Sequence, residues 1–231
     1  MDPDLRWSAA RIALAEKLYD WGVVQFGAFK LKLHEQNPDA PLSPIYINLR
    51  TPDNPKPGPL TPERVQEIAK FFFWRSRMLK MSCDYVAGIP RAGDPFAEEF
   101  MRIYNAAFPY PIHRLQMIKE ESGSGRRIIG VETQLGNFRR GGDVLLLDDL
   151  VTKAESKMEA IGVLEGRKFS VRHLLVVIDR SQGGQAKLKK KGFALHCIFH
   201  LSWLLEHYWK AGAIDQAKNE EVKAYLNTNA S

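Results

Sequence analysis

The fold is decided by one stretch of the sequence, Val144-Leu145-Leu146-Leu147-Asp148-Asp149-Leu150-Val151-Thr152-Lys153-Ala154-Glu155-Ser156. Its first four residues are uniformly apolar, as in strands that are covered by helices on both faces of a parallel sheet. An acid pair follows this strand, and residues 156–164 have the apolar spacing of a helix. Ligands of open α/β sheets bind at the carboxyl ends of the strands. We therefore expect a ligand site where residues 144–147 end.

The chain on either side repeats the same alternation of strands and helices. Such alternation is typical of an α/β domain with a largely parallel, twisted sheet flanked by helices. The apolar patterns predict strands at 85–88, 111–116, 144–147, 173–178 and 195–199. They predict helices at 5–21, 63–81, 95–105, 156–164, 185–191, 203–210 and 220–226.

The first 60 residues do not show this alternation of strands and helices. Two strands are expected at 23–32 and 45–49, and the five prolines of residues 51–62 indicate a linker or an ordered loop. We expect a single domain over residues 1–231. Within it, residues 1–60 form an amino-terminal hood and linker, residues 61–203 the core, and residues 204–231 a carboxyl-terminal helical segment.

Composition narrows the classes of partner. A net charge of +6 favours anionic ligands. The lysine-rich run 187–191 lacks interleaved aromatic residues, so we expect a solvated helix face and no nucleic-acid binding. Two cysteines exclude a disulfide framework or a zinc ribbon, and the six histidines are scattered without metal-ligand spacing. No secretory signal or membrane span is expected, which suggests a cytoplasmic protein.

The acid pair calls for a ligand. Two adjacent carboxylates at the end of a buried strand are costly unless they bind something, and the vicinal hydroxyls of a ribose or a hydrated Mg²⁺ would satisfy them. Thr152, Ser156 and the free N–H groups at the start of the helix suit a phosphate. The alternative is a solvated loop in which Asp149 or Thr152 caps the helix. The order of strand, acid pair, hydroxyl and helix favours a functional site.

These residues resemble a known family. Residues 145–156 are similar to the phosphoribosyl-diphosphate (PRPP) motif of the type I phosphoribosyltransferases. Further segments resemble the orotate phosphoribosyltransferases, particularly the form fused into UMP synthase. They follow one another in the family's order along nearly the whole chain: Phe26-Gly27-Ala28-Phe29, Ser43-Pro44-Ile45-Tyr46-Ile47-Asn48-Leu49-Arg50, Asp84-Tyr85-Val86-Ala87-Gly88-Ile89-Pro90 and Asp179-Arg180-Ser181-Gln182-Gly183-Gly184.

The resemblance implies roles for individual residues. Asp148 and Asp149 would hold the ribose hydroxyls and the Mg²⁺ shell, and Arg180 would bind the orotate carboxylate in a bidentate contact that lysine cannot reproduce. Lys32 would reach the pyrimidine and the reaction centre, with Phe29 and Tyr46 also lining the base site. The remaining PRPP contacts would come from Thr152, Lys153, Ala154, Glu155, Ser156, Gly88, Arg91 and Gly93. Taken singly, Lys32 is also consistent with an exposed strand lysine and Arg91 with an ordinary loop cation, but both interpretations are weaker for residues that belong to a collinear set of matches.

The sequence departs from the family in two places. Residues 118–125 match a mobile catalytic loop that closes over the site; Lys119 is kept there, but Ser122 replaces the catalytic lysine. Arg126 and Arg127 follow directly and are candidate substitutes. In the phosphate loop, Ala154 stands where glycine is usual, and Glu155 places a negative charge beside the expected phosphate.

The implied activity is the transfer of the phosphoribosyl group of PRPP to orotate, which gives orotidine 5′-monophosphate and pyrophosphate. Two alternatives stay open: a weakly catalytic or non-catalytic relative with a regulatory role, and a transferase for another base. The resemblance also implies a homodimer, and a decarboxylase, if required, would be a separate chain. Asp149→Asn should abolish PRPP binding and leave the fold intact, because a solvated acid pair stabilises little.

Overall fold

The computed structural model describes residues 3–31, 34, 37–122, 125–132 and 141–228. Its helices are α1 (Pro3–Asp20), α2 (Pro62–Met78), α3 (Asp94–Ala107), α4 (Glu155–Gly166), α5 (Gly184–Lys190), α6 (Leu201–Lys210) and α7 (Gln216–Thr228). Its strands are β1 (Val24–Phe29), β2 (Ser43–Ile47), β3 (Tyr85–Gly88), β4 (His113–Ser122), β5 (Gly125–Glu132), β6 (Asp143–Val151), β7 (Ser170–Asp179) and β8 (Ala194–His200).

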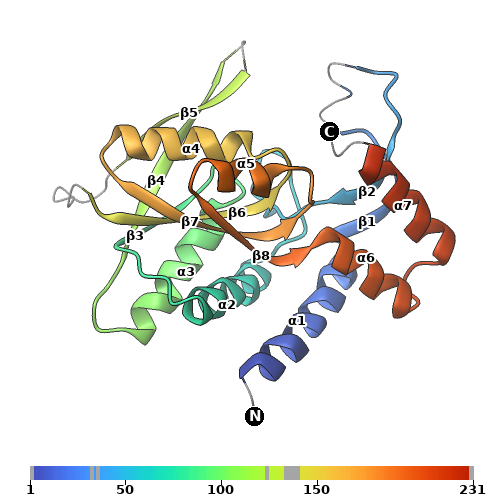
Figure 1. The fold of residues 1–231 in the computed structure, drawn as a ribbon, viewed down its shortest axis with the longest axis horizontal. Helices are drawn as coiled ribbons and strands as arrows, with labels where there is room; N and C mark the ends of the chain where they lie inside the picture. Colours follow the sequence, from blue (N-terminus) through green and yellow to red (C-terminus); the bar gives the residue numbers. More distant parts are fainter. Residues whose placement is uncertain (1–2, 32–33, 35–36, 123–124, 133–140, 229–231) are drawn as a thin grey trace.

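A six-stranded sheet forms the body of the molecule, in the order β5-β4-β3-β6-β7-β8. All neighbours run parallel except β4 and β5, which form an antiparallel pair. In Figure 1, α2 and α3 cover one face of this sheet while α4 and α5 cover the other. The expected α/β fold with a largely parallel, helix-flanked sheet is confirmed.

The apolar strand of the opening stretch lies at the centre of this sheet and separates two cores. Leu145 and Leu147 pack with the side chains of α2 and α3, and Leu146 packs with those of α4. Successive side chains of a strand point to opposite faces. A uniformly apolar strand is therefore stable only with helices on both faces, and residues 144–147 accordingly lie between the two helical layers.

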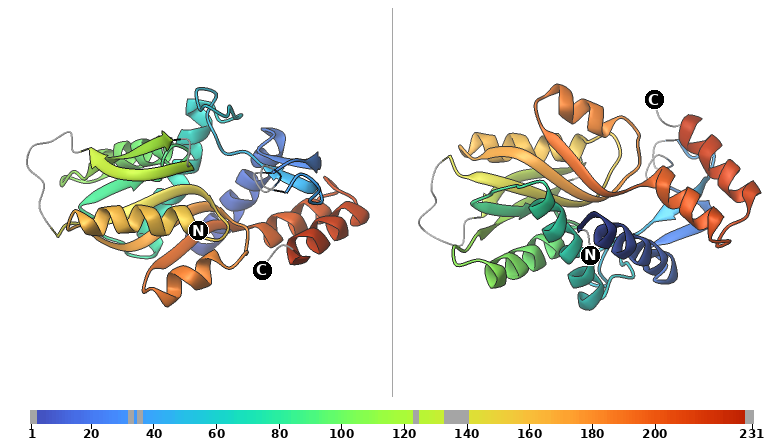
Figure 2. Two further views of the ribbon diagram at one scale, coloured as in Figure 1. Left: turned by 90° about the horizontal axis from the view of Figure 1, so that it is seen from above. Right: turned by 60° about the horizontal axis from the view of Figure 1, so that its bottom comes forward.

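A separate two-stranded sheet, β1 with β2, stands beside the body together with α6 and α7. Figure 2 shows α6 and α7 alongside these two strands. The two ends of the chain are joined there: the Tyr208 hydroxyl of α6 donates to the Ala15 carbonyl of α1 at 2.8 Å, and the Tyr19 hydroxyl donates to the Ala213 carbonyl at 3.1 Å.

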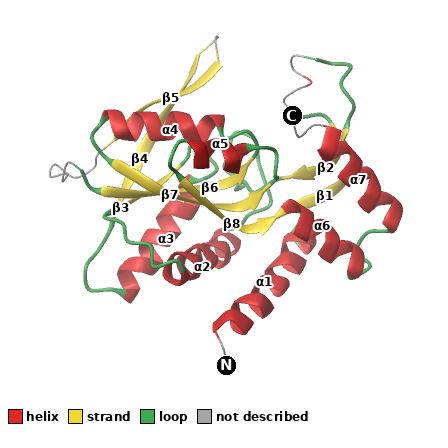
Figure 3. Cartoon of the chain, in the orientation of Figure 1, coloured by secondary structure: helices red, strands yellow, loops and turns green. Residues whose placement is uncertain are grey.

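Three sequence predictions need correction. The central strand does not end at Leu147, because β6 continues through the acid pair to Val151. The strand expected at 111–116 continues to Ser122 and pairs with β5, so the described part of the expected catalytic loop belongs to a hairpin, as Figure 3 shows; its catalytic role stays a prediction. The last helix begins at Gln216, one turn earlier than the apolar spacing suggested. No described helix is both long and apolar enough to cross a membrane.

Candidate functional site

The loops that follow β3, β6 and β7 meet at one edge of the sheet. Gly88 at the end of β3 pairs with Leu147 of β6, and Val151 at the end of β6 pairs with Asp179 of β7. The Arg180 N–H then donates to the Val151 carbonyl at 3.0 Å. Parallel strands thus bring the acid pair, the expected pyrophosphate loop and Arg180 to the same edge.

The acid pair is buried rather than solvated. Asp148 is 5% exposed and Asp149 is 9% exposed. The Asp149 N–H donates to Asp148 Oδ1 at 2.9 Å, and the Leu150 N–H donates to Asp149 Oδ1 at 2.7 Å. The expectation of a solvated pair is wrong because β6 carries both residues into the sheet before the chain turns.

Lys157 of α4 holds the first of these acids, and sequence reasoning missed it. Its ammonium lies 2.5 Å from Asp148 Oδ2 and 2.6 Å from the Leu150 carbonyl, and its side chain is only 6% exposed. The signal was present in the helical spacing. Lys157 lies three and four residues before Ala160 and Ile161, so it shares their buried face. A lysine on the apolar face of a helix that follows an acid pair indicates an ion pair.

The second acid is only partly ionised near neutral pH. The pKa of Asp149 is raised to about 7, chiefly by burial and also by the neighbouring Asp148, while Lys157 opposes this shift. At the start of α3, burial likewise raises the pKa of Asp94 to about 6; Arg114 opposes this shift and Asp148 adds to it. Three acids therefore face one another at this edge, an environment that favours a cation or hydroxyl donors.

The phosphate loop has the conformation that glycine would favour. Ala154 has a φ of 62°, in the left-handed region, and its carbonyl accepts the Met158 N–H at 3.0 Å as α4 begins. Thr152 is half-buried, and its carbonyl accepts the Gly184 N–H at 2.8 Å. Three further predicted phosphate contacts lie exposed on this loop: Lys153, Glu155 and Ser156.

The loop after β3 is tightly closed by its two glycines. A Cβ on Gly88 would lie 2.4 Å from the carbonyl carbon of Gly93, and a Cβ on Gly93 would lie 2.4 Å from the Leu147 carbonyl oxygen. Arg91 is exposed on this loop, and the Pro90–Arg91 peptide is cis. Lys119 of β4 donates from Nζ to the Pro90 carbonyl at 3.0 Å, so it lies against the predicted pyrophosphate site.

The structure describes the other residues of the predicted site in less detail. Arg127 is exposed on β5 opposite Glu120. Ser122 and Arg126 lie on the paired backbone of the same hairpin. Lys32 lies outside the described residues.

Arg180 carries an unused donor. Its Nε is buried, and no hydrogen-bond partner for it is present in the described part of the chain. Burial lowers the pKa of its guanidinium, while Tyr225 of α7 raises it. The same helix packs on β2, where Tyr46 stacks on Phe29 with ring centroids 5.5 Å apart. The predicted base-binding residues are thus linked to Arg180 through α7.

Two surface cavities, of about 170 and 240 Å³, open beside Asp143 and Asp84 respectively. Both residues lie at the amino-terminal edge of the sheet, where β6 and β3 begin. Neither cavity is lined by the acid pair, the phosphate loop or Arg180. The candidate site therefore rests on the residues that converge at the opposite edge.

The α/β fold of this chain matches that of solved phosphoribosyltransferases. No family model matches the chain. The chain is 28% identical over 219 residues to the UMP synthase of Bos taurus, covering 94% of this chain and 41% of the relative. It is 27% identical over 214 residues to the orotate phosphoribosyltransferase of Pyrobaculum islandicum, covering 92% of this chain and 97% of the relative.

A solved structure shows the same similarity. The UMP synthase of Leishmania donovani superposes with a TM-score of 0.70 at 27% identity, covering 94% of this chain and 42% of that one. This chain therefore spans about two fifths of the length of the UMP synthases it matches and almost all of the archaeal enzyme. The resemblance to the orotate phosphoribosyltransferases is confirmed.

Proposed function

We propose that this protein is an orotate phosphoribosyltransferase, which transfers the phosphoribosyl group of PRPP to orotate in the biosynthesis of UMP. The single observation that carries this proposal is the position of Arg180 beside the PRPP motif. Arg180 is half-buried, and its buried Nε has no partner in the described part of the chain; such a guanidinium is suited to a planar carboxylate, because two parallel N–H groups can donate to its two oxygens. Orotate has such a carboxylate.

The two acids of the pair would have different roles in binding the ribose. Asp148 is already engaged by Lys157, so Asp149 is the carboxylate that is left for the ribose hydroxyls or the shell of a Mg²⁺ ion. The donor set fits Mg²⁺, since carboxylate oxygens are its usual ligands, and a bound cation would stabilise the ionised form of Asp149, whose pKa is raised without it. When bound, Mg²⁺ would supply positive charge to the pyrophosphate of PRPP.

Cations near the loop after β3 would stabilise the leaving group. As the bond to the anomeric carbon breaks, negative charge accumulates on the pyrophosphate, and charges placed there lower the barrier more than they stabilise the bound substrate. Arg91 lies on this loop, and Lys119 reaches it from β4. Thr152, Ser156 and the N–H groups at the start of α4 would hold the 5′-phosphate.

A homodimer and a cytoplasmic location are part of the same proposal. The resemblance that implies the activity also implies a loop that works across a subunit interface. In support of an interface, α2 presents Trp74 and Met78 at 44% and 37% exposure, next to Leu79 at 36%. Sedimentation at micromolar concentration tests this proposal, and a strict monomer would contradict it.

A second candidate is a relative that binds PRPP or a nucleotide without efficient turnover. One observation favours it: Lys157 occupies Asp148, a carboxylate that the ribose would otherwise contact. The same chemistry with a different base is the third candidate.

Calorimetry with PRPP, orotate and orotidine 5′-monophosphate, combined with one turnover assay in Mg²⁺, separates the three. Turnover of orotate supports the first candidate, and binding without turnover supports the second. PRPP binding without affinity for orotate supports the third. In each case Asp149→Asn should abolish PRPP binding, and wild-type PRPP affinity in this variant would contradict the assignment of the site.

A further inference from the structure

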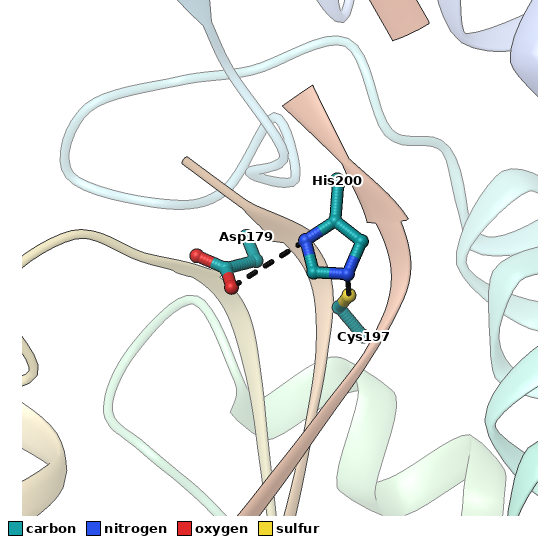
Figure 4. A group of neighbouring side chains, drawn as sticks. All are labelled: Asp179, Cys197 and His200. Atoms are coloured by element: carbon teal, nitrogen blue, oxygen red, sulfur yellow. Dashed lines mark hydrogen bonds and ion pairs between the residues drawn. The ribbon is translucent and has the colours of Figure 1, made fainter. Parts of the chain in front are cut away.

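Three side chains of different chemistry meet beyond the acid pair, at the ends of β7 and β8. Figure 4 shows the imidazole of His200 between the Asp179 carboxylate and the Cys197 thiol. His200 Nδ1 lies 3.6 Å from Asp179 Oδ2, and His200 Nε2 lies 3.5 Å from Cys197 Sγ. One ligand atom from each residue can be chosen so that all three lie within 4.8 Å of one another.

We propose that Asp179, Cys197 and His200 form a binding site for a single Zn²⁺ ion. Thiolate sulfur, imidazole nitrogen and carboxylate oxygen are the three ligand types that zinc takes in proteins, at about 2.0–2.3 Å. Tetrahedral geometry at these bond lengths places the ligand atoms roughly 3.3–3.8 Å apart. The two measured separations involve different nitrogens of the ring, so the ring has to turn before one nitrogen faces both the carboxylate and the thiol; at present the chosen ligand atoms lie within 4.8 Å of one another. Because the His200 side chain is 50% exposed, its ring is free to turn so that one nitrogen serves the ion.

The charges of the cluster suit a divalent ion. The Asp179 side chain is 2% exposed, and its Oδ1 accepts the Ser181 N–H at 2.8 Å, which leaves Oδ2 for the ion. The pKa of the Cys197 thiol is raised to about 12, chiefly by burial and also by Asp179. Zinc would displace this proton to solvent and form a sulfur–zinc bond. One thiolate and one carboxylate then neutralise the two positive charges of the ion.

The guanidinium groups of Arg11 and Arg75 lie near Cys197, and a proposal for a cation site has to account for their positive charge. Arg11 and Arg75 both lower the pKa of the thiol, so both stabilise the thiolate that zinc requires. Arg11 is stacked over the ring of Trp203, with its Cζ atom 4.4 Å from the centroid. The exposed side of His200 supplies an entry path and room for water as a fourth ligand.

The same three residues do not suit a thiol nucleophile. A reactive cysteine needs a depressed pKa so that the thiolate is populated at neutral pH. The pKa of Cys197 is raised instead, so histidine and aspartate alone do not activate it. A metal ion overcomes this barrier because coordination deprotonates the thiol outright. Of the two chemistries, metal binding is the one that this arrangement supports.

The chain order explains why the cluster cannot be seen in the sequence as one motif. Cys197 and His200 are three residues apart, but Asp179 comes from the preceding strand. Parallel pairing sets Asp179 directly opposite His200 in the register of β7 and β8. The third ligand is therefore supplied by the sheet.

Cobalt titration of the metal-free protein tests the site without reference to enzymatic activity. We expect one Co²⁺ per chain and a sulfur-to-cobalt charge-transfer band in the near ultraviolet, which Zn²⁺ should displace. Cys197→Ser should remove this band. His200→Gln should weaken binding more than about 100-fold, because even groups that only hydrogen-bond to metal ligands contribute 10- to 100-fold.

Cys83→Ser is the matched control. Cys83 is also a half-buried thiol whose pKa is raised to about 12, but it lies beside Asp84 and Asp143, away from this cluster. This variant should keep the band and the wild-type affinity. Circular dichroism confirms that each variant is folded. Absence of the band in the wild-type protein, or a band unchanged in Cys197→Ser, would overturn the proposal.

Discussion

The ammonium of Lys157 lies 2.5 Å from Asp148 Oδ2, and both side chains are only 6% exposed. A buried ion pair of this kind is costly to break from one side, because the remaining charge is left without a partner in a poorly solvated environment. The pair also places a fixed positive charge against Asp148, the first acid of the stretch that resembles the PRPP motif. In the proposed function, this leaves Asp149 as the carboxylate that meets the ligand.

Lys157→Met should lower the free energy of unfolding by about 3–5 kcal/mol at neutral pH, because Asp148 would be left as a buried, unpaired charge. Urea denaturation measures this change. In the double variant Asp148→Asn/Lys157→Met, most of the loss should be recovered, since neither charge remains. Equal losses in the single and double variants would show that the lysine contributes through packing alone.

Asp94 should make the protein less stable as the pH rises from about 4 to about 6. The pKa of this carboxyl is raised to about 6 in the folded state, so the native protein binds more protons than the unfolded chain in this window. Stability is then lost as the pH rises, by about 2–3 kcal/mol for a shift of this size. Asp94→Asn should remove this loss, so the variant should exceed the wild-type stability at pH 8 and match it near pH 4. Parallel stability curves for the two proteins would contradict the prediction.

Arg180→Lys should weaken orotate binding by about 30-fold or more, which corresponds to about 2 kcal/mol, and should affect PRPP much less. Lysine cannot present two parallel donors to a carboxylate. Calorimetry with each ligand measures the difference. Arg172→Lys is the matched control, because Arg172 lies at the other end of β7, and its side chain is 70% exposed. An equal loss of affinity for both ligands would show that Arg180 does not select the base.

Gly93→Ala should destabilise the protein by about 3 kcal/mol and disturb the loop after β3. Its Cβ would lie 2.4 Å from the Leu147 carbonyl oxygen and 2.5 Å from the Ile89 nitrogen, and both atoms belong to the backbone. Gly162→Ala is the opposite case. Gly162 lies in the middle of α4 with nothing within 4 Å of an added Cβ, so alanine should stabilise the helix by about 0.5–1 kcal/mol. Thermal unfolding of the two variants in parallel checks both signs.

The sequence by itself determined the alternation of the fold and the place of its ligand edge. Uniform apolarity over Val144–Leu147 requires cover on both faces, and the helical spacing of the following segments supplies it. These are local patterns with periods of 2 and 3.6 residues, so they can be read without knowing which segments meet. The role of Arg180 came only from the resemblance, because residues 179–184 match a segment of the family.

The sequence did not show that one segment, β5, forms a strand. Ile128 and Val131 are buried on β5, and the glycines before them suit a hairpin turn. The resemblance predicted a mobile loop over residues 118–125 and no strand after it. The antiparallel pairing with β4 depends on contacts between the two strands, and neither strand shows this pairing alone.

Only the tertiary structure decided how the charges are arranged. Asp148 meets Lys157 because α4 packs back on the sheet, and Asp179 meets His200 because β7 and β8 lie in register. Burial then shifts the pKa values of Asp149 and Asp94, which the identity of a residue cannot do. Electrostatic environment depends on distance in space and on exclusion of water, and both are properties of the folded chain.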